Sequence, residues 1–307
     1  MAVTLGDPRG IGPEVVQRAL AQERLDADIT LIGPDDQIAK IPADHRVGVG
    51  AWGSGSGGRE AGNEESDAGR LAGRAVEQAV DLVRAGTVDA IATGPVHKHA
   101  LHLAGYRYPG LTEFLAHLAG ADVAMMLATG NLRVVLVTTH IPLRDVPGQV
   151  TTERVISTGR IAGRALQEWW GIEHPRLAVC ALNPHAGDSG LFGDEDDRVL
   201  RPAAQALGAV GPLPADTVFV RALKGEFDAV LTPYHDVGMT AVKVAGFGEG
   251  VNVTLGLPFP RVAPDHGTAL DIAGKGMADP RSMRAALELG VELARRSRVG
   301  RGTVAPA

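Results

Sequence analysis

At 307 residues the chain is longer than one hydrophobic core usually organises, which predicts two domains. Its 45% hydrophobic and 21% charged residues are typical of a globular protein, and no apolar run is long enough to span a bilayer. The net charge of −6 gives no broad attraction to nucleic acid or to an anionic membrane, so small anionic ligands would need local cations. A single cysteine and the lack of a leader-like first segment indicate a cytoplasmic protein without disulfides.

Short apolar runs that end in glycine or proline alternate with helical patterns along the chain. The apolar runs predict strands near residues 29–32, 90–93, 134–139, 177–182 and 229–232. The helical patterns predict helices near residues 13–22, 68–84, 112–119, 152–169, 198–207 and 281–295. Strands without polar alternation, each followed by a helix, are typical of a largely parallel sheet that is covered on both faces. The predicted fold class is therefore α/β.

Three histidines follow predicted strands that are far apart in the sequence. His140 closes the strand near 134–139, His185 follows the strand near 177–182, and His235 follows the strand near 229–232. Because ligands of parallel α/β sheets bind beyond the carboxyl ends of the strands, these three side chains can converge. Three imidazoles with an open position suit Zn, Co or Ni better than Mg. The alternative is three separate histidines that cap strands.

Two other features suggest chemistry but have a better structural interpretation. His97, His99 and His102 are crowded into one short segment, and two of them are expected on a helix surface, so we do not predict a metal site there. Cys180 lies inside the apolar run 177–182, where a buried strand residue is favoured over a nucleophile.

Cationic and amide side chains follow the third histidine. Lys243, Asn252 and Arg261 are separated by glycines and could together hold a phosphate or a carboxylate, although each alone would be interpreted as a surface residue. Residues 265–276 are predicted to form a loop that leads into a short helix, whose backbone amides could hold a nucleotide.

The sequence resembles the 4-hydroxythreonine-4-phosphate dehydrogenase family of pyridoxal phosphate biosynthesis along nearly its whole length. Two of the matching motifs are Gly6-Asp-Pro-Arg-Gly-Ile-Gly-Pro-Glu14 and Thr138-Thr-His-Ile-Pro-Leu-Arg-Asp145. The other matching segments are residues 93–98, 112–114, 125–129, 182–187, 211–217, 234–236, 250–258 and 265–276. Residues 266–276 are also similar to the cofactor loop of isopropylmalate and isocitrate dehydrogenases, whose fold this family shares.

The resemblance implies two α/β/α lobes with mainly parallel sheets and an active-site cleft between them, like isopropylmalate dehydrogenase. Residues 1–112 and 246–307 would form the first lobe, which includes the cofactor loop 265–276. Residues 113–245 would form the second lobe, with the metal histidines and the dimer interface. The family also implies a homodimer whose sites are completed by the second subunit, with His235 expected from the partner.

The resemblance assigns roles to individual residues. The implied metal ligands are His140, His185 and His235. The implied substrate-binding residues are Thr112, Lys243, Asn252 and Arg261. The cofactor is assigned to His266, Gly267, Thr268 and Asp271. The candidates for proton transfer, or for orienting a histidine, are Asp216 and Asp236, with loop capping as the alternative.

The activity implied is the NAD-linked oxidation and decarboxylation of 4-phosphooxy-L-threonine to 3-amino-2-oxopropyl phosphate, in vitamin B6 biosynthesis. It requires a divalent metal, with Zn expected first and Co or Mg as alternatives; NAD rather than NADP rests on the resemblance. Leu111 stands where the family carries a histidine before the threonine. The same chemistry on threonate or erythronate 4-phosphate is therefore an alternative. A phosphotransacetylase-type acyltransferase and a non-catalytic metabolite-binding relative are further alternatives.

Overall fold

The structure is a computed structural model that describes residues 1–53 and 61–302, with side chains described for residues 1–53 and 64–297. The chain divides into two compact units. Unit 1 comprises Met1–Asp122 and Leu257–Ala307, and unit 2 comprises Val123–Gly256. The first unit thus combines residues from the beginning and the end of the sequence, and the chain passes from one unit to the other after residues 122 and 256. The lobes expected from the resemblance change at residues 112 and 245.

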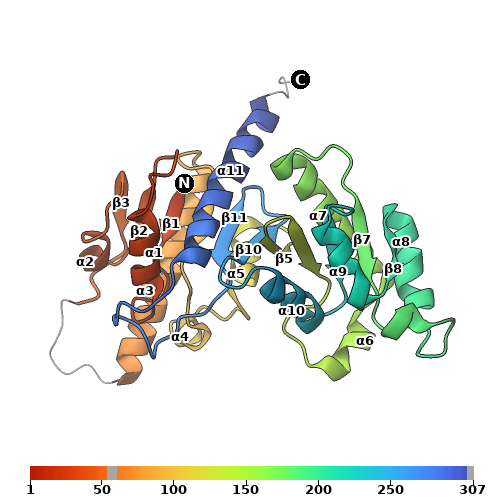
Figure 1. Cartoon of the computed structure of the whole chain (residues 1–307). Coiled ribbons are helices and arrows are strands. Elements are labelled where there is room, and N and C mark those ends of the chain that lie inside the picture. The colour runs from red at the N-terminus through yellow and green to blue at the C-terminus, as the bar shows by residue number, and fades with distance from the viewer. Residues whose placement is uncertain (54–60, 303–307) are drawn as a thin grey trace. The chain divides into compact units, whose positions relative to one another are not determined.

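The described part of unit 1 forms a five-stranded parallel sheet (Figure 1). Its strand order is β3 (His45–Gly48), β2 (Thr30–Gly33), β1 (Ala2–Thr4), β4 (Ile91–Thr93) and β11 (Arg261–Pro264). The order reverses at β1, because β1 pairs with β2 on one side and with β4 on the other. Loops at the carboxyl ends of β1, β4 and β11 therefore lie at one edge of this sheet.

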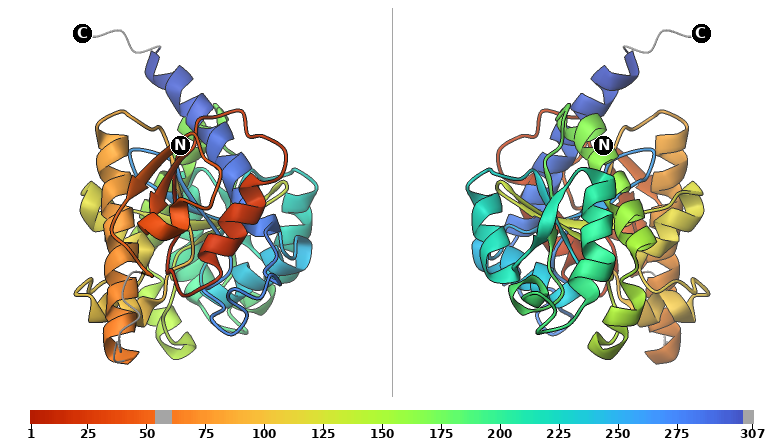
Figure 2. Two further views of the ribbon diagram at one scale, coloured as in Figure 1. Left: turned by 90° about the vertical axis from the view of Figure 1, so that its left-hand side faces the viewer. Right: turned by 90° about the vertical axis from the view of Figure 1, so that its right-hand side faces the viewer.

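Helices cover both faces of the unit 1 sheet (Figure 2). α3 (Ala61–Arg84) packs on one face, and α1 (Gly12–Leu20) lies beside α11 (Arg281–Gly302) on the other. The first turn of α1 contains Pro13 and Glu14, which are both favourable in that position. The shorter helices of this unit are α2 (Asp35–Ile38), α4 (Lys98–Leu103) and α5 (Leu111–Ala119).

The described residues of unit 2 form a mixed sheet. Its strand order is β10 (Val251–Leu255), β5 (Ala124–Thr129), β6 (Leu132–Leu136), β9 (Ala229–Thr232), β7 (Leu177–Cys180) and β8 (Val210–Leu213). β5 pairs antiparallel with both β10 and β6, whereas β6, β9, β7 and β8 run parallel. Because β10 pairs with β5, it belongs to this unit, although its sequence position predicted the first lobe.

The helices of unit 2 bury two opposite faces of its sheet. α9 (Ala215–Leu223) and α10 (His235–Ala245) bury Val218 and Val242 against strand residues such as Val134 and Val230. α7 (Thr152–Trp170) and α8 (Arg201–Leu207) pack together on the other face. Short helical turns complete the unit: η1 (Leu143–Asp145), α6 (Val146–Gln149), η2 (Pro184–Gly187) and η3 (Asp196–Leu200).

The predicted α/β class with a mostly parallel arrangement is confirmed. α9 and α10 were not predicted, and neither were the antiparallel strands β5 and β10. Among the described helices, none has the length and apolar character that crossing a membrane requires.

Candidate active site

His140 and His235 lie side by side in unit 2. Both follow neighbouring parallel strands, since His140 comes after β6 and His235 opens α10 directly after β9. The backbone N–H and the hydroxyl group of Thr138 donate to the carbonyl of Pro233 at 3.2 and 2.7 Å. These hydrogen bonds hold the segments that follow β6 and β9 side by side. The two imidazole rings end 5.4 Å apart between their centroids, at an interplanar angle of 46°.

This separation suits two ligands of one metal ion. Zn–N bonds of about 2.0–2.1 Å and tetrahedral angles put the centres of two ligating imidazoles about 5 Å apart. The Nδ1 atom of His235 lies 2.7 Å from Oδ1 of Asp236, which leaves Nε2 of that ring for a ligand. A carboxylate on the second ring nitrogen is the usual partner of a metal-binding histidine. The pair therefore has the chemistry that zinc, cobalt or nickel prefers.

His185 stands in a separate, strained turn. It is exposed and has a φ of 54°, followed by Ala186 at 57°. This left-handed region costs about 1–2 kcal/mol for each residue other than glycine. No group of three or more His, Cys, Asp or Glu side chains that could hold a metal ion occurs among the residues that the structure describes.

The three histidines therefore do not form a three-ligand site within one described chain. We expected His140 and His185 to share a subunit and His235 to come from the partner. Within the described chain His235 lies beside His140, so the geometry groups these two rings, and which subunit supplies each ligand stays a prediction.

The two candidate aspartates occupy equivalent helix positions but differ in their contacts. Asp236 is the second residue of α10 and touches His235. Asp216 is the second residue of α9 and is exposed. An acid in a first helical turn is favourable by itself, so capping alone is sufficient to explain Asp216.

Two of the predicted substrate-binding residues are in unit 2. Lys243 is exposed on α10, eight positions after His235. Asn252 is half-buried on β10, and its Oδ1 atom is buried with no hydrogen-bond partner. A buried amide oxygen in this state costs free energy unless a ligand or water satisfies it.

The other two predicted substrate-binding residues are in unit 1. The side chain of Arg261, at the start of β11, is buried and donates from Nη2 to Oγ1 of Thr93 at 2.6 Å. Burial lowers the pKa of Arg261 to about 10, and the negative charge of Glu113 opposes that shift. The guanidinium group is still charged at neutral pH, so it is a preorganised binder for an anion. Thr112 is half-buried near the start of α5, one residue before Glu113.

Lys98 is a further cation of this neighbourhood that the sequence analysis did not select. A Cβ atom at Gly110, the N-cap of α5, would lie 3.9 Å from Cε of Lys98 and 3.1 Å from Oε2 of Glu113. Lys98 therefore lies beside the first turn that carries Thr112. Lys98 comes five residues after the end of β4, the strand that pairs with β11, and this position was the available sequence clue.

The cofactor loop differs from its prediction. Residues 265–276 form turns and no helix, and the next helix, α11, begins at Arg281. Gly274 and Gly276 have φ angles of 72° and 69°, and Ala269 has a φ of 40°, which are incompatible with a right-handed helix. A helix N-terminus is therefore not available there to hold a phosphate.

Residues of the first βα segment hold this loop in place. The N–H group of Ile11 donates to the carbonyl of Thr268 at 2.9 Å. Glu14 accepts the N–H of Ala278 at 3.0 Å, and Arg18 donates to the carbonyl of Ala278 at 2.5 Å. The loop is thus fixed at both ends by α1 and the residues before it.

The assigned cofactor residues differ in exposure. Thr268 is buried, whereas Gly267 and Asp271 are exposed. The Nδ1 atom of His266 lies 3.1 Å from the carbonyl of Gly267, and its Nε2 atom is buried without a hydrogen-bond partner. Two exposed residues and an unsatisfied imidazole nitrogen could contact a nucleotide.

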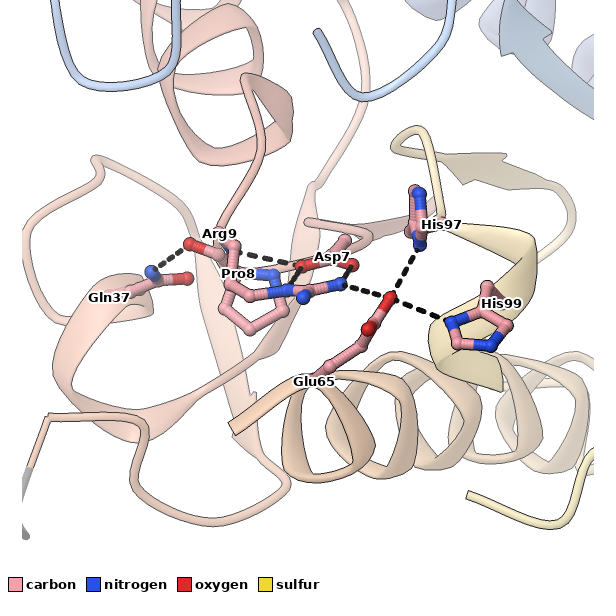
Figure 3. A network of polar contacts seen from close by, with 7 residues as sticks. All are labelled: Asp7, Pro8, Arg9, Gln37, Glu65, His97 and His99. Atoms are coloured by element: carbon pink, nitrogen blue, oxygen red, sulfur yellow. Dashed lines mark hydrogen bonds and ion pairs between the residues drawn. The ribbon is translucent and has the colours of Figure 1, made fainter. Parts of the chain in front are cut away.

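His97 and His99 converge on a carboxylate of unit 1 (Figure 3). Their Nδ1 atoms lie 3.0 and 3.2 Å from Oε1 of Glu65, which also lies 3.6 Å from Nη2 of Arg9. Arg9 in turn forms a bidentate pair with the buried Asp7, at 3.1 and 2.8 Å. Burial raises the pKa of Glu65, but the hydrogen bond from His99 and the charge of Arg9 outweigh burial and lower it. This network joins the first turns of α3 to the loops after β1 and β4.

The remaining two residues considered in the sequence have structural surroundings. Nε2 of His102 lies 2.8 Å from the carbonyl of Tyr108, away from the Glu65 network. Cys180 is fully buried on β7, and burial, followed by the charge of Asp196, raises the pKa of its thiol to about 12. The thiolate that a nucleophile requires is therefore scarce at neutral pH.

Comparisons with known proteins match nearly the whole chain. The family model described as pyridoxal phosphate biosynthetic protein PdxA matches residues 11–290. A 4-hydroxythreonine-4-phosphate dehydrogenase of Xanthomonas campestris is 43% identical, covering 97% of this chain and 99% of the relative. A D-threonate 4-phosphate dehydrogenase of Salmonella typhimurium is 42% identical over 96% of this chain and 98% of the relative. The crystal structure of 4-hydroxythreonine-4-phosphate dehydrogenase from Klebsiella pneumoniae superposes with a TM-score of 0.86 at 39% identity, covering 96% and 97% of the two chains.

Proposed function

Since the chain belongs to the PdxA family of pyridoxal phosphate biosynthetic proteins and is a dehydrogenase, we propose that it oxidises and decarboxylates 4-phosphooxy-L-threonine with NAD and a divalent metal. The observation that carries this proposal is the pair of imidazoles, 5.4 Å apart, at the ends of neighbouring strands. The product would be 3-amino-2-oxopropyl phosphate. Zinc is the first candidate for the metal, with cobalt or magnesium as alternatives.

The side chains of this chain have distinct tasks in that reaction. When bound, a divalent metal lowers the pKa of the substrate's hydroxyl group, and NAD accepts the hydride. His140 and His235 would hold the metal together with His185, and Asp236 would keep the proton on Nδ1 of His235. Oxidation of the hydroxyl group gives a β-keto acid. The bond between the α-carbon and the carboxylate then breaks, CO₂ leaves, and the α-carbon takes up a proton to give the ketone product.

The remaining named residues would bind the substrate and the cofactor. Arg261 and Lys243 would hold anionic groups, and the unsatisfied Oδ1 of Asn252 would accept a hydrogen bond from the substrate. Thr112 would add a hydroxyl group. The cofactor-binding residues would be His266, Gly267, Thr268 and Asp271.

A homodimer would complete the site, with His185 supplied by the second subunit. Several large apolar side chains of unit 2 are exposed: Leu143 at 67%, Leu191 at 72%, Val244 at 82% and Phe247 at 81%. Phe192, 46% exposed, lies 6.2 Å from the ring of His185. Large exposed apolar side chains are typical of surfaces that bind another protein.

An assay with a small panel of substrates tests the proposal. NADH formation should be fastest with 4-phosphooxy-L-threonine and should stop when a chelator is added. Faster turnover of D-threonate or erythronate 4-phosphate would keep the metal chemistry and change the substrate. Acylation of coenzyme A by an acyl phosphate, without NADH formation, would instead indicate an acyltransferase. No turnover of any of these substrates would indicate a non-catalytic binding protein.

Replacing Asp236 should weaken metal binding without disturbing the fold. Asp236→Ala removes the carboxylate 2.7 Å from Nδ1 of His235, and losing such a partner typically costs about 10-fold or more in metal affinity. Asp216→Ala is the matched control, because it also removes an aspartate from the second position of a helix. Zn²⁺ affinity by competition with a chromophoric chelator should change only in the first variant. Equal affinities for the two variants would rule out the orienting role.

Restoring a histidine before Thr112 tests the substrate. In Leu111→His a donor is added in the first turn of α5, where a charge-assisted hydrogen bond is worth about 1.5–3 kcal/mol. If 4-phosphooxy-L-threonine is the substrate, kcat/KM should rise by about tenfold or more. Leu103→His, at the end of α4, is the control for a surface histidine. A several-fold decrease in kcat/KM would mean that Leu111 lines a pocket shaped for another molecule.

A further inference from the structure

The turn that carries His185 is left-handed over six consecutive residues. The φ angles from residue 185 to residue 190 are 54°, 57°, 83°, 43°, 59° and 91°. Only two of these six residues are glycines, so four side chains occupy a conformation that L-residues avoid. A strained segment of this kind persists only where its surroundings overdetermine it, and such segments cluster at functional sites.

A buried carboxylate anchors the entry to this turn. Asp196 is 0% exposed, and its two oxygens accept the N–H groups of Leu182 at 2.9 Å and of Asn183 at 3.0 Å. These two residues connect β7 to the turn. The side chain of Asn183 donates to Glu195 at 2.8 Å, so two neighbouring acids at the start of η3 hold the connection.

The body of the turn also closes against the same carboxylate. A Cβ atom on Gly187 would lie 2.9 Å from the carbonyl of Gly193 and 3.7 Å from Cβ of Asp196. The carbonyl of Gly187 accepts the N–H of Phe192 at 3.1 Å. Hydrogen bonds therefore hold the turn where it begins, and its middle packs on Asp196, so the backbone that carries His185 is fixed.

Burial of a carboxylate costs free energy unless its oxygens accept hydrogen bonds. Both oxygens of Asp196 accept hydrogen bonds from backbone N–H groups just before the turn. We propose that Asp196 is a positioning residue that holds His185 in the left-handed turn, in the direction that a metal ligand requires. This inference rests on the proposed function, in which His185 binds the metal.

Cobalt binding to the intact protein tests the inference. In Asp196→Asn the shape is kept, but an NH₂ group faces a backbone N–H, so one of the two hydrogen bonds is lost. We expect Co²⁺ to bind about 10-fold more weakly, with an altered visible absorption spectrum, as for other residues that orient a ligand. Asp197→Asn is the matched control, since Asp197 is exposed and pairs with Arg201 at 2.6 Å. Co²⁺ affinity should be unchanged in the control.

Unfolding by urea, measured in parallel, separates positioning from a merely structural role. If Asp196→Asn lowers the unfolding free energy but the folded protein binds Co²⁺ as tightly as before, the inference is overturned. If the variant does not fold, Gly187→Ala perturbs the same contact from the turn's side, and unchanged Co²⁺ affinity there would overturn it equally. His185→Ala distinguishes metal binding by His185 from positioning of His185 by Asp196. Unchanged Co²⁺ affinity in that variant would remove His185 from the proposed metal site, whereas a loss there with none in Asp196→Asn would refute the positioning role alone.

Discussion

Mixing His140→Ala with His185→Ala should restore about a quarter of the active sites, although each variant alone is expected to be nearly inactive. His140 and His235 lie together in one chain, so a complete site would take this pair from one subunit and His185 from the other. In a mixed dimer one site lacks both ligands, and the other has all three. Random exchange makes about half of the dimers mixed, and half of their sites are intact.

The control for this experiment combines substitutions of two ligands that are expected to come from the same subunit. When His140→Ala is mixed with His235→Ala, every site in the mixed dimer lacks one ligand, so no activity should return. Mass spectrometry establishes that subunits have exchanged. If activity recovers in the control mixture and not in the first mixture, the result would support the original expectation that His235 comes from the partner subunit. No recovery in either mixture would contradict a shared site.

Removing the metal should abolish turnover and leave the fold intact. Stabilisation of a developing charge by a metal ion is worth several kcal/mol, so turnover should fall by about 1000-fold or more. The histidines follow β6, β7 and β9, whose residues are almost entirely buried in an apolar core that does not depend on an ion. Circular dichroism of the chelated protein should therefore match that of the untreated protein.

Restoring the metal is the control for chelation. Activity should return when Zn²⁺ or Co²⁺ is added back to the dialysed protein. A preparation shown to be metal-free by elemental analysis that still turns over at the full rate would refute the metal hypothesis. Loss of circular dichroism on chelation would instead mean that the ion is part of the folding core.

The strands could be predicted because burial on both faces leaves a clear pattern. The apolar runs near 177–182 and 229–232 became β7 and β9, and their carboxyl ends correctly located two of the histidines. β10 was not assigned to its unit, because pairing with β5 is a long-range property that its own residues do not specify. The same limit applies to α10, whose first residues, His235 and Asp236, looked like a loop after a strand.

The site could be predicted in its residue types but not in its grouping. Nothing local indicates that His235 lies beside His140, since hydrogen bonds between the extensions of β6 and β9 bring them together. The left-handed turn was also not predicted, because Ala186 and Ser189 are not residue types that favour positive φ. Asp196 was missed because its importance comes from its burial and from backbone donors 13 and 14 residues away along the chain.

The construction of unit 1 from both chain ends has a consequence for biosynthesis. β11 pairs with β4, and α11 packs beside α1, so the first unit needs residues that are synthesised after those of unit 2. Unit 2 is complete once residue 256 has been made. The middle of the chain can therefore finish folding while the N-terminal strands still lack β11, the reverse of the usual order in which the N-terminal domain is completed first.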